Sequence, residues 1–253
     1  MFTVVSAAIR RYDRQVTKRL TVVLLCWVTV LSMGVIAGQG RADAARCPDV
    51  EVIFARGTAE TAPPVGLTGL AFSTELRRLL PGRSVNVWGV PYKASARFSD
   101  RRYVAQTAID GINMIQRRME RIASACPRTK IVLGGYSQGA VITTYATSST
   151  PVRLPARYER ELTGLPPVLP TSVAGHVAAV VLLGAPSDRW MRDIGTPPLR
   201  VGTAYRGKTY RYCIPGDTIC NGTKVGQPNA LHVLYGPGPV SVAAARYAAQ
   251  RIR

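Results

Sequence analysis

The sequence predicts an α/β fold in which a parallel β-sheet is covered by helices on both faces. Two observations lead to this prediction. Short apolar runs alternate along the chain with longer segments of helical periodicity, as in parallel sheets. A Gly-x-Ser-x-Gly pentapeptide, residues 135–139, lies between one such run and a predicted helix. The roughly 200 residues after the N-terminal leader are enough for one domain with a sizeable core.

The predicted elements follow one another along most of the chain. Strands are expected at residues 49–55, 85–90, 129–133, 177–183 and 209–213. Helices are expected at residues 68–80, 103–125 and 240–252, and another begins directly after the pentapeptide. The long helix, residues 103–125, has apolar side chains on one face and basic ones on the other, which indicates packing against a sheet.

Residues 148–172 do not fit this alternation. The segment contains five prolines, and one short helix is expected in it around residues 158–162. A long irregular insertion next to a ligand-binding edge is either a lid or a surface loop without a role in catalysis. The sequence leaves both interpretations open.

Residues 1–44 are expected to be a secretory signal peptide. The first 19 residues contain five basic side chains, residues 20–40 carry no charge, and an Ala-x-Ala sequence ends at Ala44. About 20 apolar residues can also span a bilayer, so an uncleaved membrane anchor is the alternative. Because the basic residues would stay in the cytoplasm, residues 45–253 are exported in both cases.

Cysteine usage agrees with export. Cys26 lies in the leader, and the rest of the chain contains an even number: Cys47, Cys126, Cys213 and Cys220. Four cysteines allow three pairings. The short spacing favours a local Cys213–Cys220 disulfide, which leaves Cys47 to pair with Cys126. Zinc is a weak alternative, because none of the Cys-x₂-Cys spacings of structural zinc sites is present.

The chain is strongly basic, with a formal net charge of +19. Without residues 1–46, which contain seven basic and two acidic residues, the charge is +14. The basic residues are dispersed and no nucleic-acid-binding motif is recognisable, so no nucleic-acid partner is expected. Two interpretations remain: a solvated charged surface, or attraction to an anionic envelope or phospholipid surface.

Ser137, Asp217 and His232 are the candidate catalytic residues. A strand before Ser137 and a helix after it are typical of a nucleophile elbow, whereas the bare pentapeptide is a common chance match in a chain with 23 glycines. Of the two histidines, His176 opens an apolar run and is interpreted as the start of a strand. His232 follows Asp217 in a Pro/Gly-rich region typical of loops, and the order Ser, Asp, His is that of α/β-hydrolases.

Several further segments carry a more specific resemblance. They are CPDV (47–50), FARGTAE (54–60), PYKAS (91–95), GGYSQGA (134–140), CIPGDTIC (213–220) and HVLY (232–235). Together they resemble the cutinase family, and in particular its secreted bacterial members, from about Cys47 to the C-terminus. The resemblance implies a single-domain α/β-hydrolase with a central parallel five-stranded sheet and the two disulfides described above. It also implies serine-dependent ester hydrolysis without a cofactor.

The resemblance also implies a role for each matching residue. Ser137 matches the nucleophile, His232 the general base and Asp217 the acid that orients the base. The oxyanion hole would consist of the backbone N–H of Gln138 and the hydroxyl of Thr58. No metal is expected, because two histidines and scattered carboxylates give no ligand cluster.

We therefore expect a secreted or envelope-associated serine esterase that acts on short- to medium-chain or lipid esters. One alternative is a phospholipase, thioesterase or acyltransferase with the same triad. Another is a non-catalytic envelope interaction protein, against which the intact triad argues. The sequence departs from the family at residues 184–187, where Gly-Ala-Pro-Ser replaces Gly-Asp-Pro, and in its longer Pro-rich insertion. We expect both departures to influence which ester is accepted. The sequence does not specify the acyl or the alcohol part of the substrate. Neither the sequence nor the resemblance specifies an oligomeric state.

Overall fold

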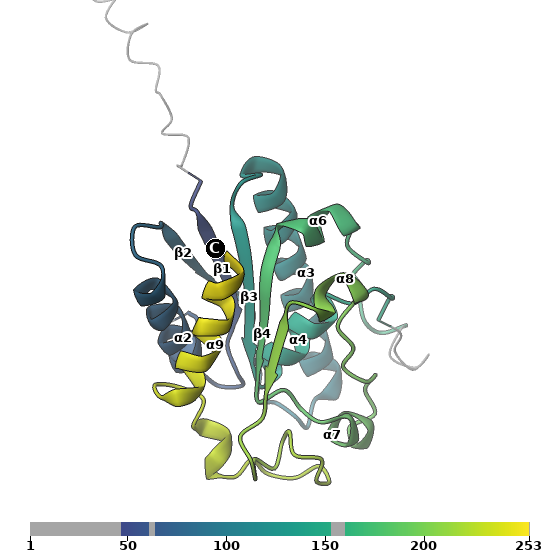
Figure 1. Ribbon diagram of the computed structural model, residues 1–253. Coiled ribbons are helices and arrows are strands. Elements are labelled where there is room, and N and C mark those ends of the chain that lie inside the picture. The colour runs from purple at the N-terminus through teal and green to yellow at the C-terminus, as the bar shows by residue number, and fades with distance from the viewer. Residues whose placement is uncertain (1–46, 61–63, 153–159, 253) are drawn as a thin grey trace, which may run out of the picture. The chain divides into compact units, whose positions relative to one another are not determined.

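The computed structural model describes residues 47–60, 64–152 and 160–252. These residues form a five-stranded sheet with the order β2-β1-β3-β4-β5, and every neighbouring pair of strands is parallel (Figure 1). The strands are β1 (Val50–Ala55), β2 (Val85–Gly89), β3 (Lys130–Tyr136), β4 (Val177–Leu183) and β5 (Thr209–Tyr212). The predicted fold class is confirmed.

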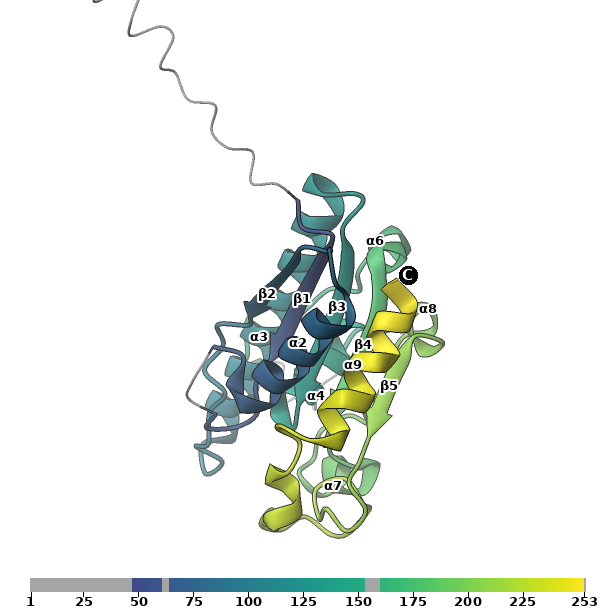
Figure 2. The same cartoon turned by 60° about the vertical axis from the view of Figure 1, so that its left-hand side comes forward.

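Helices cover both faces of the sheet, as Figures 1 and 2 show. One face is covered by α2 (Gly66–Leu79) and α9 (Pro239–Ile252), and the other by α3 (Arg101–Ala125) and α4 (Gln138–Ala146). The shorter helices are α6 (Thr171–His176), α7 (Asp188–Asp193), α8 (Thr203–Arg206) and the 3₁₀ helix η1 (Ala230–Val233).

Strand β1 explains why the sequence contains continuous apolar runs. Alternate side chains of a strand point to opposite faces of a sheet. Val52 and Phe54 belong to the core under α2 and α9, whereas Ile53 belongs to the core under α3 and α4. Phe54 packs against Phe72 of α2 with ring centroids 5.9 Å apart. A strand buried on both faces needs apolar residues at consecutive positions, which the sequence provides.

Glu51 is a fully buried carboxylate within this apolar strand. It accepts hydrogen bonds from Nε of Arg118 at 2.8 Å and from the side-chain amide of Asn86 at 2.7 Å. The Arg118 guanidinium also lies over the ring of Trp88, 5.4 Å from its centroid. Arg118 therefore faces the sheet, although the sequence assigned the basic residues of this helix to the face away from it.

The Pro-rich segment and its surroundings differ most from the prediction. Residues 153–159 lie outside the described residues, and with them the first two residues of the helix expected at 158–162. Of its other three residues, 160 and 161 form a turn and 162 has no regular structure, so the described part of this segment is not helical. Helix α6 was not predicted. His176 is its last residue and directly precedes β4, so this histidine ends a helix rather than opening a strand.

All five strands are parallel, so their carboxyl ends meet at one edge of the sheet, the lower edge in Figure 1. Ligands of parallel α/β sheets bind beyond this edge. Ser137 directly follows β3, and the segment with Asp217 and His232 follows β5. Within residues 47–60, 64–152 and 160–252, no helix has the length and apolar character needed to cross a bilayer. The run at 20–40 lies outside the described residues.

Candidate active site

Ser137 occupies a sharp turn between β3 and α4. Its backbone has φ 51° and ψ −118°, a strained conformation for a residue with a side chain. The flanking glycines are required by close backbone contacts. A Cβ on Gly139 would lie 2.0 Å from the carbonyl oxygen of Ala55, and one on Gly135 would lie 2.3 Å from the carbonyl oxygen of Gly139. The turn therefore has the geometry of a nucleophile elbow.

The three candidate catalytic side chains lie in hydrogen-bonding contact. Nε2 of His232 is 2.9 Å from Oγ of Ser137. Nδ1 of His232 is 2.9 Å from Oδ2 and 3.1 Å from Oδ1 of Asp217. Asp217 is fully buried, His232 is 6% exposed and Ser137 is half-buried. In this arrangement the carboxylate can orient the imidazole, and the imidazole can take the proton of the serine hydroxyl. His176 lies at the amino end of β4, the opposite edge of the sheet.

The Asp217 carboxylate accepts hydrogen bonds from its own loop as well as from the imidazole. The backbone N–H of Ile219 donates to Oδ1 at 2.9 Å, and the hydroxyl of Tyr235 donates to Oδ2 at 2.7 Å. These donors compensate the loss of water around a buried charge. The carboxylate is therefore held by several groups at once, in an orientation that suits the imidazole.

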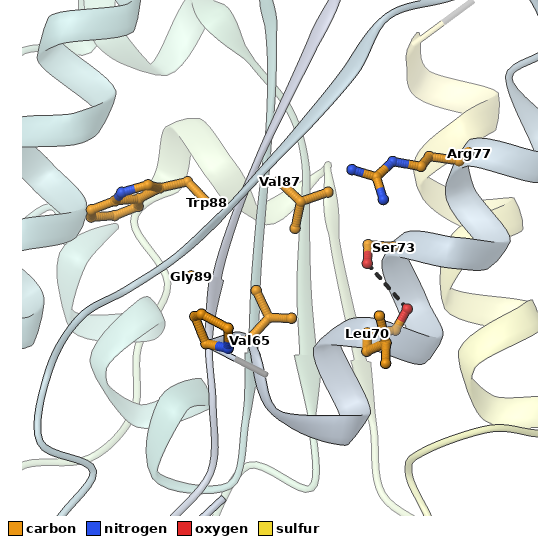
Figure 3. A pocket seen from close by; sticks show the side chains of 8 residues that line it. Val65, Leu70, Ser73, Arg77, Val87, Trp88 and Gly89 are labelled. Atoms are coloured by element: carbon orange, nitrogen blue, oxygen red, sulfur yellow. Dashed lines mark hydrogen bonds between the residues drawn. The ribbon is translucent and has the colours of Figure 1, made fainter. Parts of the chain in front are cut away.

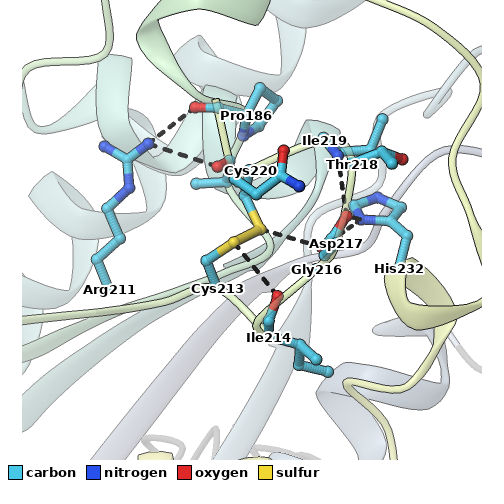
Figure 4. The surroundings of a disulfide bond; sticks show 12 residues. Pro186, Arg211, Cys213, Ile214, Gly216, Asp217, Thr218, Ile219, Cys220 and His232 are labelled. Atoms are coloured by element: carbon cyan, nitrogen blue, oxygen red, sulfur yellow. Dashed lines mark hydrogen bonds and ion pairs between the residues drawn. A yellow bond between two sulfur atoms is a disulfide. The ribbon is translucent and has the colours of Figure 1, made fainter. Parts of the chain in front are cut away.

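Both predicted disulfides are present. Cys47 is bonded to Cys126, and Cys213 to Cys220. Figure 4 shows that the second disulfide lies beside Asp217, and Sγ of Cys220 is 3.1 Å from Oδ2 of the carboxylate. A disulfide sulfur carries no proton, so this is a close contact and not a hydrogen bond. The short disulfide thus closes the loop that carries the candidate acid.

Cys213, Asp217 and Cys220 are also the residues that come nearest to a metal-ligand set in the described part of the chain. Their candidate ligand atoms all lie within 4.8 Å of one another. The two sulfur atoms are bonded to each other, however, and a cysteine binds a metal as its thiolate. In the disulfide form these three residues do not fit a metal ion.

The two predicted oxyanion-hole groups come from adjoining segments. Gln138 is the first residue of α4, so its backbone N–H has no acceptor within the helix. Thr58 lies in the loop after β1 and is half-buried. The close approach of Gly139 to Ala55 brings the first turn of α4 against this loop. An anion above Ser137 would also face the positive end of the α4 dipole.

Glu60 holds the loop that contains Thr58. Its carboxylate accepts a hydrogen bond from the backbone N–H of Gly57 at 2.7 Å and another from the N–H of Thr68 at 3.2 Å. The second contact links the loop to the start of α2. Glu60 stands within a segment that carries the family resemblance, but its role was not predicted, because only the folded loop brings these donors to its carboxylate.

Tyr136 and Tyr235 are the other residues of the site that sequence reasoning missed. The Tyr136 hydroxyl donates to the backbone carbonyl of His232, and the Tyr136 ring lies 5.3 Å from the imidazole and 5.4 Å from the Tyr235 ring. Both tyrosines stand inside the segments that carry the family resemblance. Their position there is a signal that they matter, but the sequence does not show which groups they contact.

The segment beside the site exposes apolar side chains. Val233 and Leu234 directly follow His232 and are 71% and 58% exposed, and Phe98, between β2 and α3, is 56% exposed.

The loop after β4, where Gly-Ala-Pro-Ser replaces the expected family pattern, is held by Arg211, which donates to the carbonyl of Pro186 at 2.8 Å (Figure 4). This departure from the pattern therefore leaves an anchored loop.

A separate hollow of about 410 Å³ lies between α2 and the edge strand β2 (Figure 3). Its lining is mostly apolar and includes Val65, Leu70, Val87 and Trp88. No candidate catalytic residue lines it. We assign no function to this hollow.

The chain was compared with known protein families. The family model described as Cutinase matches residues 46–252. Among curated proteins, Carboxylesterase Culp1 of Mycobacterium tuberculosis is 35% identical over 219 residues, which cover 85% of this chain and 87% of Culp1. Phospholipase Culp4 of the same organism is 36% identical over 208 residues, covering 82% of this chain and 80% of Culp4.

A solved structure gives a further comparison. The cutinase of Trichoderma reesei in complex with a phosphonate inhibitor aligns with a TM-score of 0.59 and 28% identity. The alignment covers 82% of this chain and 78% of that one. The similarity thus extends over most of both folds.

Proposed function

The chain belongs to the cutinase family and is a carboxylic ester hydrolase, and we propose that Ser137, His232 and Asp217 are its catalytic triad. The observation that carries this proposal is the unbroken chain of contacts from the Ser137 hydroxyl through the imidazole to the buried carboxylate, with both imidazole contacts at 2.9 Å. Hydrolysis then proceeds through an acyl-enzyme on Ser137.

Acylation follows from the positions of these groups. Nε2 of His232 accepts the Ser137 proton as Oγ bonds to the ester carbonyl carbon, whose oxygen takes up the negative charge. The imidazolium is stabilised by Asp217, which stays ionised. When the tetrahedral intermediate collapses, the bond to the alcohol oxygen breaks and His232 gives that oxygen its proton. The products are a free alcohol and an ester on Ser137.

Deacylation repeats these steps with water. His232 takes a proton from the water molecule as the water oxygen attacks the acyl carbon. It returns this proton to Oγ of Ser137 when the carboxylic acid product leaves. If another alcohol enters in place of water, the same acyl-enzyme yields a new ester, which is an acyltransferase reaction. In both steps we assign the oxyanion to the N–H of Gln138 and the hydroxyl of Thr58; one such donor is commonly worth about 3 kcal/mol.

We further propose that the enzyme acts on esters presented at an anionic lipid or envelope surface. Three features support this: the basic charge, the exposed Val233 and Leu234 beside His232, and the similarity to a protein named phospholipase. Exposed apolar side chains on a protein of high positive charge favour binding to anionic interfaces. The phospholipase alternative rests on these observations, and nothing in the described residues favours a non-catalytic protein.

A substrate panel tests this proposal. Short nitrophenyl esters, vesicles of zwitterionic phospholipid and vesicles with added anionic phospholipid would be compared for wild type and a Val233→Ser/Leu234→Ser double variant. We expect equal rates on soluble esters and a several-fold loss for the double variant on anionic vesicles only. Equal rates on both kinds of vesicle for both proteins would contradict surface recognition. A wild-type protein that is inactive on every ester would favour the alternative of a non-catalytic envelope interaction protein.

We propose that the protein is exported and that residues 1–44 are removed. The Ala-x-Ala sequence ending at Ala44 supports this. N-terminal sequencing of protein from the culture medium should then begin at Ala45. Recovery only in membranes, with residues 20–40 intact, would support the anchor instead.

A further inference from the structure

Tyr235 is the third group, after the imidazole and a backbone N–H, that hydrogen-bonds to the Asp217 carboxylate. Its hydroxyl donates to Oδ2 at 2.7 Å, the same oxygen that lies 2.9 Å from Nδ1 of His232. It also accepts the backbone N–H of Ile214 at 2.9 Å, and Sγ of Cys220 lies 3.3 Å away. One buried hydroxyl thus links the acid to the end of β5 and to the short disulfide.

The space around Tyr235 is shaped to hold its ring against the imidazole. Tyr235 is fully buried, and its ring centroid lies 6.1 Å from that of His232 in an edge-on arrangement. A Cβ on Gly184 would lie 3.1 Å from the Tyr235 ring and 3.3 Å from Cε1 of His232. Gly184 has a positive φ of 56° and follows β4, so its missing side chain leaves room for both rings.

We propose that Tyr235 is a positioning residue for Asp217, and through it for His232. The hydroxyl fixes the direction of the carboxylate and takes up part of the negative charge on Oδ2. It therefore limits how strongly the carboxylate holds a protonated imidazole. This inference rests on the triad proposed above and adds a fourth member, which contacts neither the substrate nor the reacting atoms.

The hydroxyl can act only as a donor to the carboxylate. Burial, together with the hydrogen bond to Asp217, raises the pKa of Tyr235 well above its usual value, so the phenol keeps its proton. The titratable groups that face Tyr235 are Asp217, His232 and Tyr136. The pKa of Tyr136 is also raised, mainly by burial, so that tyrosine is neutral too.

The test compares Tyr235→Phe with Tyr145→Phe. The Tyr145 hydroxyl donates to the carbonyl of Pro197 at 2.6 Å, so both variants lose a phenol hydrogen bond of similar length while keeping the ring. Of these two tyrosines, only Tyr235 contacts the proposed triad. Full-length purified protein would be assayed on a soluble nitrophenyl ester across pH, with the active fraction determined by fluorophosphonate titration.

For Tyr235→Phe we expect kcat to fall about tenfold, as for loss of one hydrogen bond to a charged group, with KM little changed. The acid limb of the kcat/KM profile should move to higher pH, because a carboxylate with one donor fewer holds the imidazolium more strongly. Tyr145→Phe should keep the wild-type rate and the wild-type profile.

Two results would overturn the proposal: an acid limb that stays in place or moves to lower pH, or a kcat for Tyr235→Phe equal to that of Tyr145→Phe. If either variant unfolds, titration of the folded fraction still gives the profile per active site. A wrong assignment of the triad would give a different result, because Ser137→Ala would then retain esterase activity regardless of the kinetics of Tyr235→Phe.

Discussion

The serine and its two partners are held in place by different means. Ser137 lies between regular elements: β3 is hydrogen-bonded to β1 on one side and β4 on the other, and α4 begins at the next residue. Asp217 and His232 lie in the segment between β5 and α9, where η1 is the regular element that the structure describes. The sheet itself fixes the proposed nucleophile, whereas it does not fix the proposed acid and base.

A disulfide and side-chain hydrogen bonds stabilise the segment between β5 and α9, which carries Asp217 and His232. The Cys213–Cys220 disulfide closes it, Tyr235 ties the carboxylate to Ile214, and the side-chain amide of Asn229 donates to the carbonyl of Gly216 at 2.9 Å. The positions of Asp217 and His232 therefore depend on a few individual contacts, whereas that of Ser137 depends on the whole sheet. Each of these contacts can be removed separately.

The largest effect should come from the base. His232→Ala should lower kcat by about four orders of magnitude or more, as loss of a triad member does in other serine hydrolases. His176→Ala is the matched control and should cost at most some stability, because His176 ends α6 at the opposite edge of the sheet. Steady-state kinetics on a soluble ester measures both. If a folded His176→Ala protein were inactive while His232→Ala stayed active, the assignment would be wrong.

An intermediate effect is expected for the oxyanion hole. Thr58→Val keeps the shape of the side chain but removes the hydroxyl, so kcat should fall about 100-fold. Thr58→Ser keeps the hydroxyl and should retain most of the activity. Comparison of kcat and KM for the two variants provides the check. Equal rates for valine and serine would show that the hydroxyl does not contact the oxyanion.

The smallest effect on activity separates the two disulfides. Replacing Cys213 and Cys220 by serine should lower kcat about tenfold, with a smaller rise in KM, because the loop with Asp217 gains freedom. Replacing Cys47 and Cys126 should leave kcat unchanged. On the chain-entropy model the order reverses for stability, with a loss of about 2.5 kcal/mol for the short loop and about 4.5 kcal/mol for the long one.

Kinetics and chemical denaturation of the two double variants measure this difference. Unchanged kcat in a folded Cys213→Ser/Cys220→Ser protein would show that the short disulfide stabilises the loop without positioning the acid. Reductant is not needed, so other thiol chemistry does not enter the comparison.

The centre of the sheet was predictable from the sequence because β1, β3 and β4 are buried on both faces and therefore read as continuous apolar runs. The continuous apolar run at 177–183 matches β4 at both ends. The third strand was predicted at 129–133, whereas β3 continues to Tyr136. Its end was not predicted, because Gly134 and Gly135 have low strand propensity. The short helices α6, α7, α8 and η1 were not predicted, since four to six residues carry too little periodicity.

In the site, chain order and spacing were enough to indicate Ser137, Asp217, His232 and the cysteine pairing. The supporting contacts of Glu60, Tyr136 and Tyr235 depend on which segments the fold brings together, and none of them follows a local pattern. Arg118 illustrates the same limit in the core. Its carboxylate partner, Glu51, stands 67 positions away in the sequence, so helical periodicity alone assigned it to the outer face.

Covalent labelling shows directly which residue is the nucleophile. A fluorophosphonate reacts with an activated serine, and peptide mass spectrometry locates the adduct. We expect one label per molecule, on Ser137, and no label in Ser137→Ala. Labelling of His232→Ala should be much slower, because the serine hydroxyl is then not activated. A label that persists in Ser137→Ala, or that lies on another residue of the wild-type protein, would show that Ser137 is not the nucleophile.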